Sequence, residues 1–197
     1  KISRAHLSTI QSLIHGRCKT SPQELIDKAK TSIGTDSEHL SFLLIQGIKK
    51  LKAVESQIDE YDELIQYYVN LINPVILSIP GISYTTAGLI LGEIGDVTKF
   101  KNSDSLISYA GLDIEVYESG KYKATNKSIS KKGSRYLRYA LYQVAKVIWR
   151  FDPSFNKYYQ KKLSENKHYY VILGHIQTKV VKVIYSVLKT NQPYTPR

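Results

Sequence analysis

The chain has 197 residues, 42% of them hydrophobic, so it can bury a core, and disorder is excluded for most of its length. Its single cysteine excludes an intrachain disulfide, and its longest apolar runs are too short to span a bilayer. The lone cysteine and the short apolar runs predict a soluble, cytoplasmic protein. The formal net charge of +11 indicates a nucleic acid or an anionic membrane surface as partner, and of the two we expect a nucleic acid and no membrane.

The net positive charge belongs entirely to the C-terminal part. Residues 1–72 carry nine basic and nine acidic residues, whereas the remainder carries 19 basic and 8 acidic ones. The run from Ser119 to Phe151 holds nine Lys or Arg and no Asp or Glu. Such a block indicates nucleic-acid binding, with a merely solubilising basic face as the alternative. The chain starts at Lys1 and contains no methionine, so we expect a fragment of a longer protein.

The pattern of residues 1–72 predicts three helices in a connector region. The first covers 4–15; the second starts at the cap Ser21 with Pro22 in its first turn and ends at Gly34. A long helix starts at Asp36 or Ser37 and continues to residue 72. It has apolar heptad positions at Leu44, Gly47, Leu51, Val54, Ile58, Tyr61, Ile65, Tyr68 and Ile72. This seam predicts a coiled coil over about 37–72, and it fits pairing with a second subunit as well as packing within its own chain.

Residues 73–197 read as a second, helical domain. With Asn73 as a cap, we expect a short helix at 74–78, a turn at 79–83 and a helix at 85–94 that stops at Gly95. A helix at about 103–110 follows, and 113–123 reads as a strand or extended loop with a turn at Ser119-Gly120. The last helices cover 134–151, 153–165 and 168–189. The predicted fold is mainly α, with a small extended or β-hairpin insertion.

The segment LSIPGISYTTA at 77–87 has the form of a helix-hairpin-helix motif. Gly81 permits the tight turn, and Ile79 and Ile82 fill the space between the helices. The free N–H groups of the second helix would bind a phosphate together with Ser83, Thr85 and Thr86. An ordinary helical hairpin is the alternative.

A second predicted site is the start of the basic helix. Its cations surround Gly133-Ser134 and are Lys131, Lys132, Arg135 and Arg138. Leu137, Leu141, Val144 and Ile148 form an apolar face that should pack on the core. The tyrosines at 122, 136, 139 and 142 either stack on bases or pack.

Ser119 is the candidate nucleophile. Gly120 lets the backbone approach a phosphate, and Lys121, Lys123 and Lys127 supply positive charge nearby in the sequence. From spacing alone this is a weak signal, because a serine before a glycine is ordinarily just a turn. No cluster with metal-ligand spacing and no nucleotide-binding glycine loop accompanies it.

Four segments together resemble the C-terminal transposase domain of the insertion-sequence family called IS one-ten, to which the Piv-type DNA invertases are related. They are SIPGISYTTAGLILGEIGD at 78–96, KFKNSDSLISYAGLD at 99–113, YESGKYKATNKSISKKGSRYLRYALYQVA at 117–145 and KHYYVILGHIQTKVVKVIYSVLK at 167–189. The most specific part is Ser119-Gly120 followed by Ile129, Lys131, Gly133, Leu137 and Arg138. The helical stretch before residue 73 resembles the connector of that family.

The resemblance implies a bacterial, nucleoid-associated recombinase. Ser119 would attack DNA to form a phosphoserine intermediate, together with a RuvC-like domain whose acidic residues bind Mg²⁺. That domain lies outside this chain, so the fragment itself needs no cofactor and should bind DNA without recombining it. The resemblance also implies a structured noncoding guide RNA and assembly into homo-oligomers.

Two other functions remain open on the sequence alone. The chain could be a non-catalytic helix-hairpin-helix module that holds DNA and dimerises through its coiled coil. It could also be a coiled-coil interaction protein with an incidental basic end, which charge segregation disfavours.

Overall fold

The computed structural model describes residues 2–14, 19–34, 37–114, 118–119, 122–123 and 129–196, with the backbone alone described at 3, 118–119 and 122–123. The chain forms two compact units, Lys1–Glu55 and Ser56–Arg197. The division falls within helix α3 (Glu38–Ile72), so the last turns of this helix belong to the C-terminal unit. The fold is mainly α, as predicted. A functional division at residue 72 stays a prediction.

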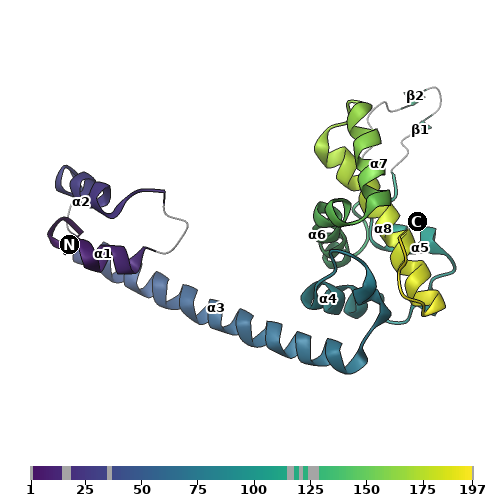
Figure 1. The fold of residues 1–197 in the computed structure, drawn as a ribbon, viewed down its shortest axis with the longest axis horizontal. Helices are drawn as coiled ribbons and strands as arrows, with labels where there is room; N and C mark the ends of the chain where they lie inside the picture. Colours follow the sequence, from purple (N-terminus) through teal and green to yellow (C-terminus); the bar gives the residue numbers. More distant parts are fainter. Residues whose placement is uncertain are drawn as a thin grey trace. The chain divides into compact units, whose positions relative to one another are not determined.

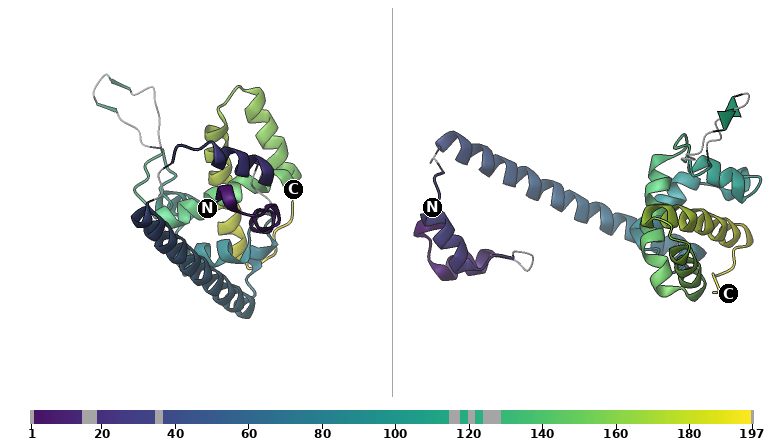
Figure 2. Two further views of the ribbon diagram at one scale, coloured as in Figure 1. Left: turned by 90° about the vertical axis from the view of Figure 1, so that its left-hand side faces the viewer. Right: turned by 90° about the horizontal axis from the view of Figure 1, so that it is seen from above.

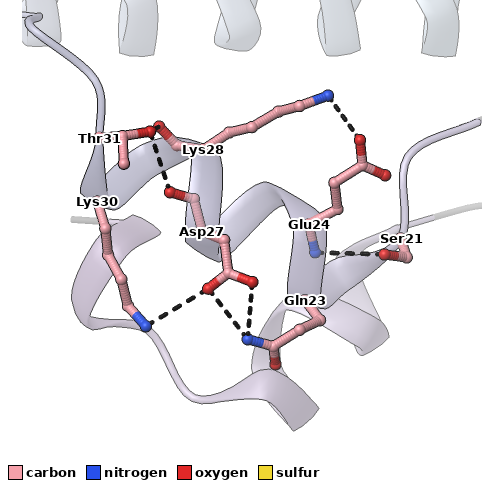
Figure 3. A network of polar contacts seen from close by, with 7 residues as sticks. All are labelled: Ser21, Gln23, Glu24, Asp27, Lys28, Lys30 and Thr31. Atoms are coloured by element: carbon pink, nitrogen blue, oxygen red, sulfur yellow. Dashed lines mark hydrogen bonds and ion pairs between the residues drawn. The ribbon is translucent and has the colours of Figure 1, made fainter.

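The N-terminal unit begins with the short helix η1 (Ile2–Arg4), then α1 (Leu7–Leu13) and α2 (Pro22–Lys30). The cap at Ser21 is confirmed, because its Oγ accepts a hydrogen bond from the Glu24 backbone N–H at 3.2 Å. Figure 3 shows the polar network along α2, in which Glu24 pairs with Lys28 at 2.7 Å. The helix ends at Lys30 rather than at the predicted Gly34. After Lys30, the Ser32 hydroxyl accepts from the Gly34 N–H, a local bond that competes with further helix.

Helix α3 begins after Ser37, whose Oγ accepts a hydrogen bond from the Leu40 N–H at 3.4 Å, so the predicted start is confirmed. At its other end Asn73 has φ 42° and donates its N–H to the Val69 carbonyl. Asn73 therefore ends α3. The prediction that it caps the next helix is wrong. Asparagine tolerates this left-handed conformation better than most residues, and Pro74 prevents the helix from continuing.

The C-terminal unit follows the predicted order of elements, with the short helix η3 as an addition that the sequence did not predict. They are η2 (Val75–Ser78), α4 (Tyr84–Ile94), η3 (Val97–Lys99), α5 (Ser103–Tyr109), β1 (Glu118–Ser119), β2 (Tyr122–Lys123), α6 (Arg135–Phe151), α7 (Pro153–Ser164) and α8 (Tyr169–Thr190). The short helix expected at 74–78 is a single turn of 3₁₀ helix. β1 and β2 pair antiparallel. Because the residues between them lie outside the described part of the chain, the hairpin insertion stays a prediction.

The core of this unit lies around α6 and α8. Helix α6 packs against α4, α7 and α8, and α8 also contacts α5 and α7 (Figure 1). Figure 2 shows the same helices from two further sides. The predicted apolar face of α6 is confirmed, since Leu137, Leu141, Val144 and Ile148 are all at most 1% exposed. Among the described residues, α8 alone is long and apolar enough to cross a membrane, and its place in the core accounts for that composition.

Candidate nucleic-acid interface

The start of α6 is tied to the loop that follows α5. The backbone N–H of Ser134 donates to the Tyr109 carbonyl at 2.7 Å, and that of Lys131 donates to the Gly111 carbonyl at 3.1 Å. Between the same two segments, Ile114 and Ile129 form an isolated antiparallel bridge. Ile114 and Ile129 are therefore paired close to the start of α6.

Two glycines allow this close approach. Gly111 has φ 63°, a left-handed conformation that disfavours other residues. A Cβ atom at Gly133 would overlap the carbonyl group of Tyr109, so a side chain there cannot be accommodated without moving the backbone. The position of the basic residues thus depends on Gly111 and Gly133.

The structure separates the four predicted cations of this helix start into two kinds. Lys131, Lys132 and Arg135 are exposed. Arg135 donates to the Tyr136 hydroxyl at 2.6 Å, and its guanidinium lies 4.7 Å from the centre of the Tyr136 ring. Arg138 is partly buried, and its Nη1 donates to the Ala110 carbonyl at 2.9 Å. Arg138 therefore helps to hold the loop, whereas the other three side chains face solvent.

Two carboxylates also lie at the start of α6, and the sequence did not predict either of them at this site. Glu93, at the end of α4, accepts a hydrogen bond from the Ser134 hydroxyl at 2.5 Å. Asp113 accepts one from the Ser130 hydroxyl at 2.5 Å. Ser134 also caps α6 by accepting from the Leu137 N–H at 3.0 Å. Because Glu93 and Ser134 are 41 residues apart, no local pattern signals this contact.

Ser119 lies in β1 with its backbone opposite Tyr122, while Glu118 is opposite Lys123. The side chains of Ser119 and Lys123 are not among those described. Gly120, Lys121 and Lys127 lie outside the described residues. The residues that flank this segment are described: Ile114 and Ile129 form a bridge, and Ile129 lies two residues before Lys131.

The turn before α4 has the local features that the sequence predicted. Gly81 has φ 87°, Ile79 and Ile82 are buried, and Ser83 caps α4 by accepting from the Thr86 N–H at 3.2 Å. The Thr86 hydroxyl is within 3.0 Å of the Ser83 hydroxyl.

The surroundings of this turn are acidic. The Thr85 hydroxyl donates to the Asp62 carboxylate of α3 at 3.1 Å, so an anion already lies at the start of α4. A Cβ atom at Gly81 would lie 3.4 Å from the backbone nitrogen of Ile148, so the turn packs on the C-terminal half of α6. Since a helix rises ~1.5 Å per residue, the two predicted phosphate sites lie about 20 Å apart along α6. The structure does not bring them together.

In the part of the chain that the structure describes, no three His, Cys, Asp or Glu side chains are grouped closely enough to hold a metal ion.

Comparison with known proteins finds this chain similar to proteins named for insertion elements and for pilin gene inversion. Residues 73–160 match the family described as "Transposase IS116/IS110/IS902 family". The chain is 33% identical over 125 residues to the "Pilin gene-inverting protein" of Moraxella bovis. The matched residues make up 62% of this chain and 38% of that protein. It is 27% identical over 146 residues to the "Insertion element IS110 uncharacterized 43.6 kDa protein" of Streptomyces coelicolor, covering 74% and 35%. The chain thus spans little more than a third of the length of these relatives.

Proposed function

We propose that this chain is the C-terminal part of a DNA transposase or site-specific recombinase, in which Ser119 is the nucleophile and the start of α6 binds DNA. One observation carries the proposal. The segment that contains Ser119 is anchored by the bridge between Ile114 and Ile129, directly before the exposed cations Lys131 and Arg135. The match of residues 73–160 to a transposase family supports the reaction class.

The proposed chemical step is a transesterification. The Ser119 oxygen attacks a backbone phosphorus, a serine–phosphate bond forms, and the bond from phosphorus to one deoxyribose oxygen breaks. The serine proton leaves, and the released deoxyribose oxygen takes up a proton. Because negative charge accumulates on the phosphate oxygens, nearby Lys and Arg side chains favour the transition state. The energy of the broken ester is kept in the new one, so strands can be rejoined without a nucleotide cofactor.

The proposed reaction needs two further components, a second domain and a guide RNA. A RuvC-like domain whose acidic residues hold Mg²⁺ would complete the site, as the resemblance to the IS one-ten family implies. A noncoding guide RNA would select the DNA, and the basic surface would serve both nucleic acids.

We also propose that α3 pairs with a second copy of the chain. Seven of its apolar heptad side chains are more than half exposed: Leu44, Leu51, Val54, Ile58, Tyr61, Tyr68 and Ile72. At Ile65 the seam instead faces its own chain, because a Cβ atom at Gly88 of α4 would lie 2.8 Å from the Ile65 Cγ2. Replacing Leu51 by lysine in the full-length protein should lower the mass measured by sedimentation; an unchanged mass would count against pairing through α3.

The nucleophile is tested in the full-length protein with labelled element-end DNA. Ser119→Ala should abolish the covalent protein–DNA adduct on a denaturing gel and leave DNA binding unchanged. Ser128→Ala, a matched change in the same segment, should retain the adduct. Adduct formation by Ser119→Ala would refute the assignment of the nucleophile.

A second candidate is a non-catalytic helix-hairpin-helix module. The positive φ of Gly81 and the burial of Ile79 and Ile82 favour it. The carboxylate of Asp62 beside Thr85 weighs against phosphate binding at this turn. This candidate requires that no serine-linked adduct forms under any condition.

A further inference from the structure

The turn between α7 and α8 is built as a rigid tip. Asn166, with φ 54°, donates its N–H to the Leu163 carbonyl at 3.0 Å, and the Lys167 N–H donates to the Lys162 carbonyl at 3.3 Å. The next residue, His168, caps α8, since its Nδ1 accepts from the Tyr170 N–H at 3.4 Å. These bonds fix where the side chains after the turn emerge.

Large apolar side chains at this tip face solvent. Tyr170 is 64% exposed, and Leu163 and Val171 are each 48% exposed. The Tyr169 and Tyr170 rings lie edge to face with centres 5.4 Å apart, and the His168 ring lies 5.5 Å from that of Tyr170. The rings contact one another but leave aromatic faces exposed to solvent. A planar group such as a base can stack on such a face.

The tip and the helices that flank it are also basic. Residues 153–197 contain eight Lys or Arg and a single acid, Glu165. That carboxylate pairs with Lys162 at 2.7 Å, while Lys161 and Lys167 are exposed. Positive potential extends onto α8: burial first, and then the charges of Lys162 and Lys167, lower the pKa of His175.

We propose that the α7–α8 tip, formed by Leu163, Lys167, Tyr169, Tyr170 and Val171, is a stacking platform for unpaired nucleotides. Bases without a partner strand can place a face on an exposed ring, while the bases of a duplex are already stacked on one another. Lys161 and Lys167 supply the charge that the backbone phosphates need. This proposal rests on the proposed function as a nucleic-acid-binding protein, and it adds a surface separate from the start of α6.

The test measures fluorescence anisotropy of labelled oligonucleotides with the full-length protein. Tyr170→Ala should weaken binding of a single-stranded oligonucleotide about five- to a hundredfold, as is typical when a stacking ring is removed, and should leave duplex binding unchanged. Tyr170→Phe should retain the affinity because the ring remains. Parallel DNA and RNA oligonucleotides distinguish the two sources of unpaired bases, and tight binding of either supports the platform.

The matched control is Tyr67→Ala, which removes a tyrosine of similar exposure, 58%, from α3 and should not affect binding. Equal single-strand affinity for Tyr170→Ala and the unmodified protein would overturn the proposal. So would a shift in self-association in place of a loss of binding, because the tip would then be a protein interface. Adduct formation at Ser119 is measured separately, so either proposal can fail while the other stands.

Discussion

Helices α4 and α6 both begin with a capping serine, and each start has a carboxylate beside it, Asp62 at α4 and Glu93 at α6, yet only the start of α6 also has exposed cations. Residues 53–98, which include the start of α4, contain seven Asp or Glu and no Lys or Arg. Around α6, Lys131 and Arg135 are exposed beside the cap Ser134. A free helix start is therefore not sufficient for anion binding, because the charges that the fold gathers around it decide the sign of the potential.

The start of α7 completes the comparison, because it carries its own anion. Asp152 is 1% exposed, and its carboxylate accepts from the Phe155 N–H at 2.9 Å and from the Tyr194 hydroxyl at 2.6 Å. A carboxylate of the chain thus occupies the position that a bound phosphate would take at this helix. Exposed cations, Arg150 and Lys157, also lie near this start, but the cap of α7 is a carboxylate, whereas the cap of α6 is the uncharged Ser134.

The largest effect is expected from Gly133→Ala. The added methyl group would overlap the Tyr109 carbonyl, so we expect a loss of about 3 kcal/mol or more in the free energy of unfolding. Urea unfolding followed by the fluorescence of Trp149 measures it. The matched control is Gly92→Ala in α4, where nothing lies within 4 Å of the new atom and stability should be unchanged or higher by about 0.5–1 kcal/mol. Equal stability of the two variants would contradict the close approach at Gly133.

The next effect concerns DNA binding at the α6 start. Lys131→Ala combined with Arg135→Ala should weaken duplex binding about thirtyfold, or ~2 kcal/mol, at low salt. Because two phosphate contacts are lost, the slope of log affinity against log salt should fall by about two. A titration series of the full-length protein gives both values. An unchanged slope would remove these side chains from the interface.

A smaller effect is expected at the α7 start. Burial and the bond to Asp152 raise the pKa of Tyr194 from 10.0 to about 12. A raised pKa in the folded state means that this contribution to stability is complete below pH 10 and is lost as pH rises through about 12. Tyr194→Phe should cost about 1.5 kcal/mol near neutral pH and should abolish that alkaline loss. Urea unfolding across this pH range checks both, and a similar alkaline loss in the variant would assign it to another group.

The carboxylate of Asp152 gives the opposite pH dependence. Burial alone would raise its pKa, but hydrogen bonds from Tyr194, Phe155 and Ser154 outweigh that effect and lower the pKa. The stability that it contributes should therefore be present above its ordinary pKa of 3.8 and be lost as pH falls through the lower folded value.

The smallest effect is expected at the α4 start. Thr85→Ala removes a hydroxyl that already donates to Asp62, so we expect DNA affinity to change less than about twofold. The same anisotropy assay applies. A loss comparable to that of the Lys131 and Arg135 variant would restore the α4 turn as a phosphate site.

Features with a local cause could be predicted from the sequence. Ser21, Ser37 and Asp152 cap the helices that follow them, and the apolar face of α6 is buried as its spacing predicts. The predicted cap at Asn73 is wrong because Asn-Pro fits both the end of one helix and the start of the next.

Contacts between distant residues could not be predicted. Arg138 binds the Ala110 carbonyl, and Ser134 binds Glu93, across 28 and 41 residues respectively. Each pairing depends on how α4, α5 and α6 pack, so no spacing in one segment reveals it. The sequence identified the charge of the α6 start but not which cation serves the fold and which faces solvent.

The most direct measurement is a crosslink between the full-length protein and element-end DNA. A photoreactive residue placed at Lys131 and, in a second protein, at Thr85 reports which helix start lies against the phosphate backbone. The account predicts an efficient crosslink from position 131 and none above background from position 85. A crosslink from position 85 alone would contradict it and assign DNA binding to the start of α4.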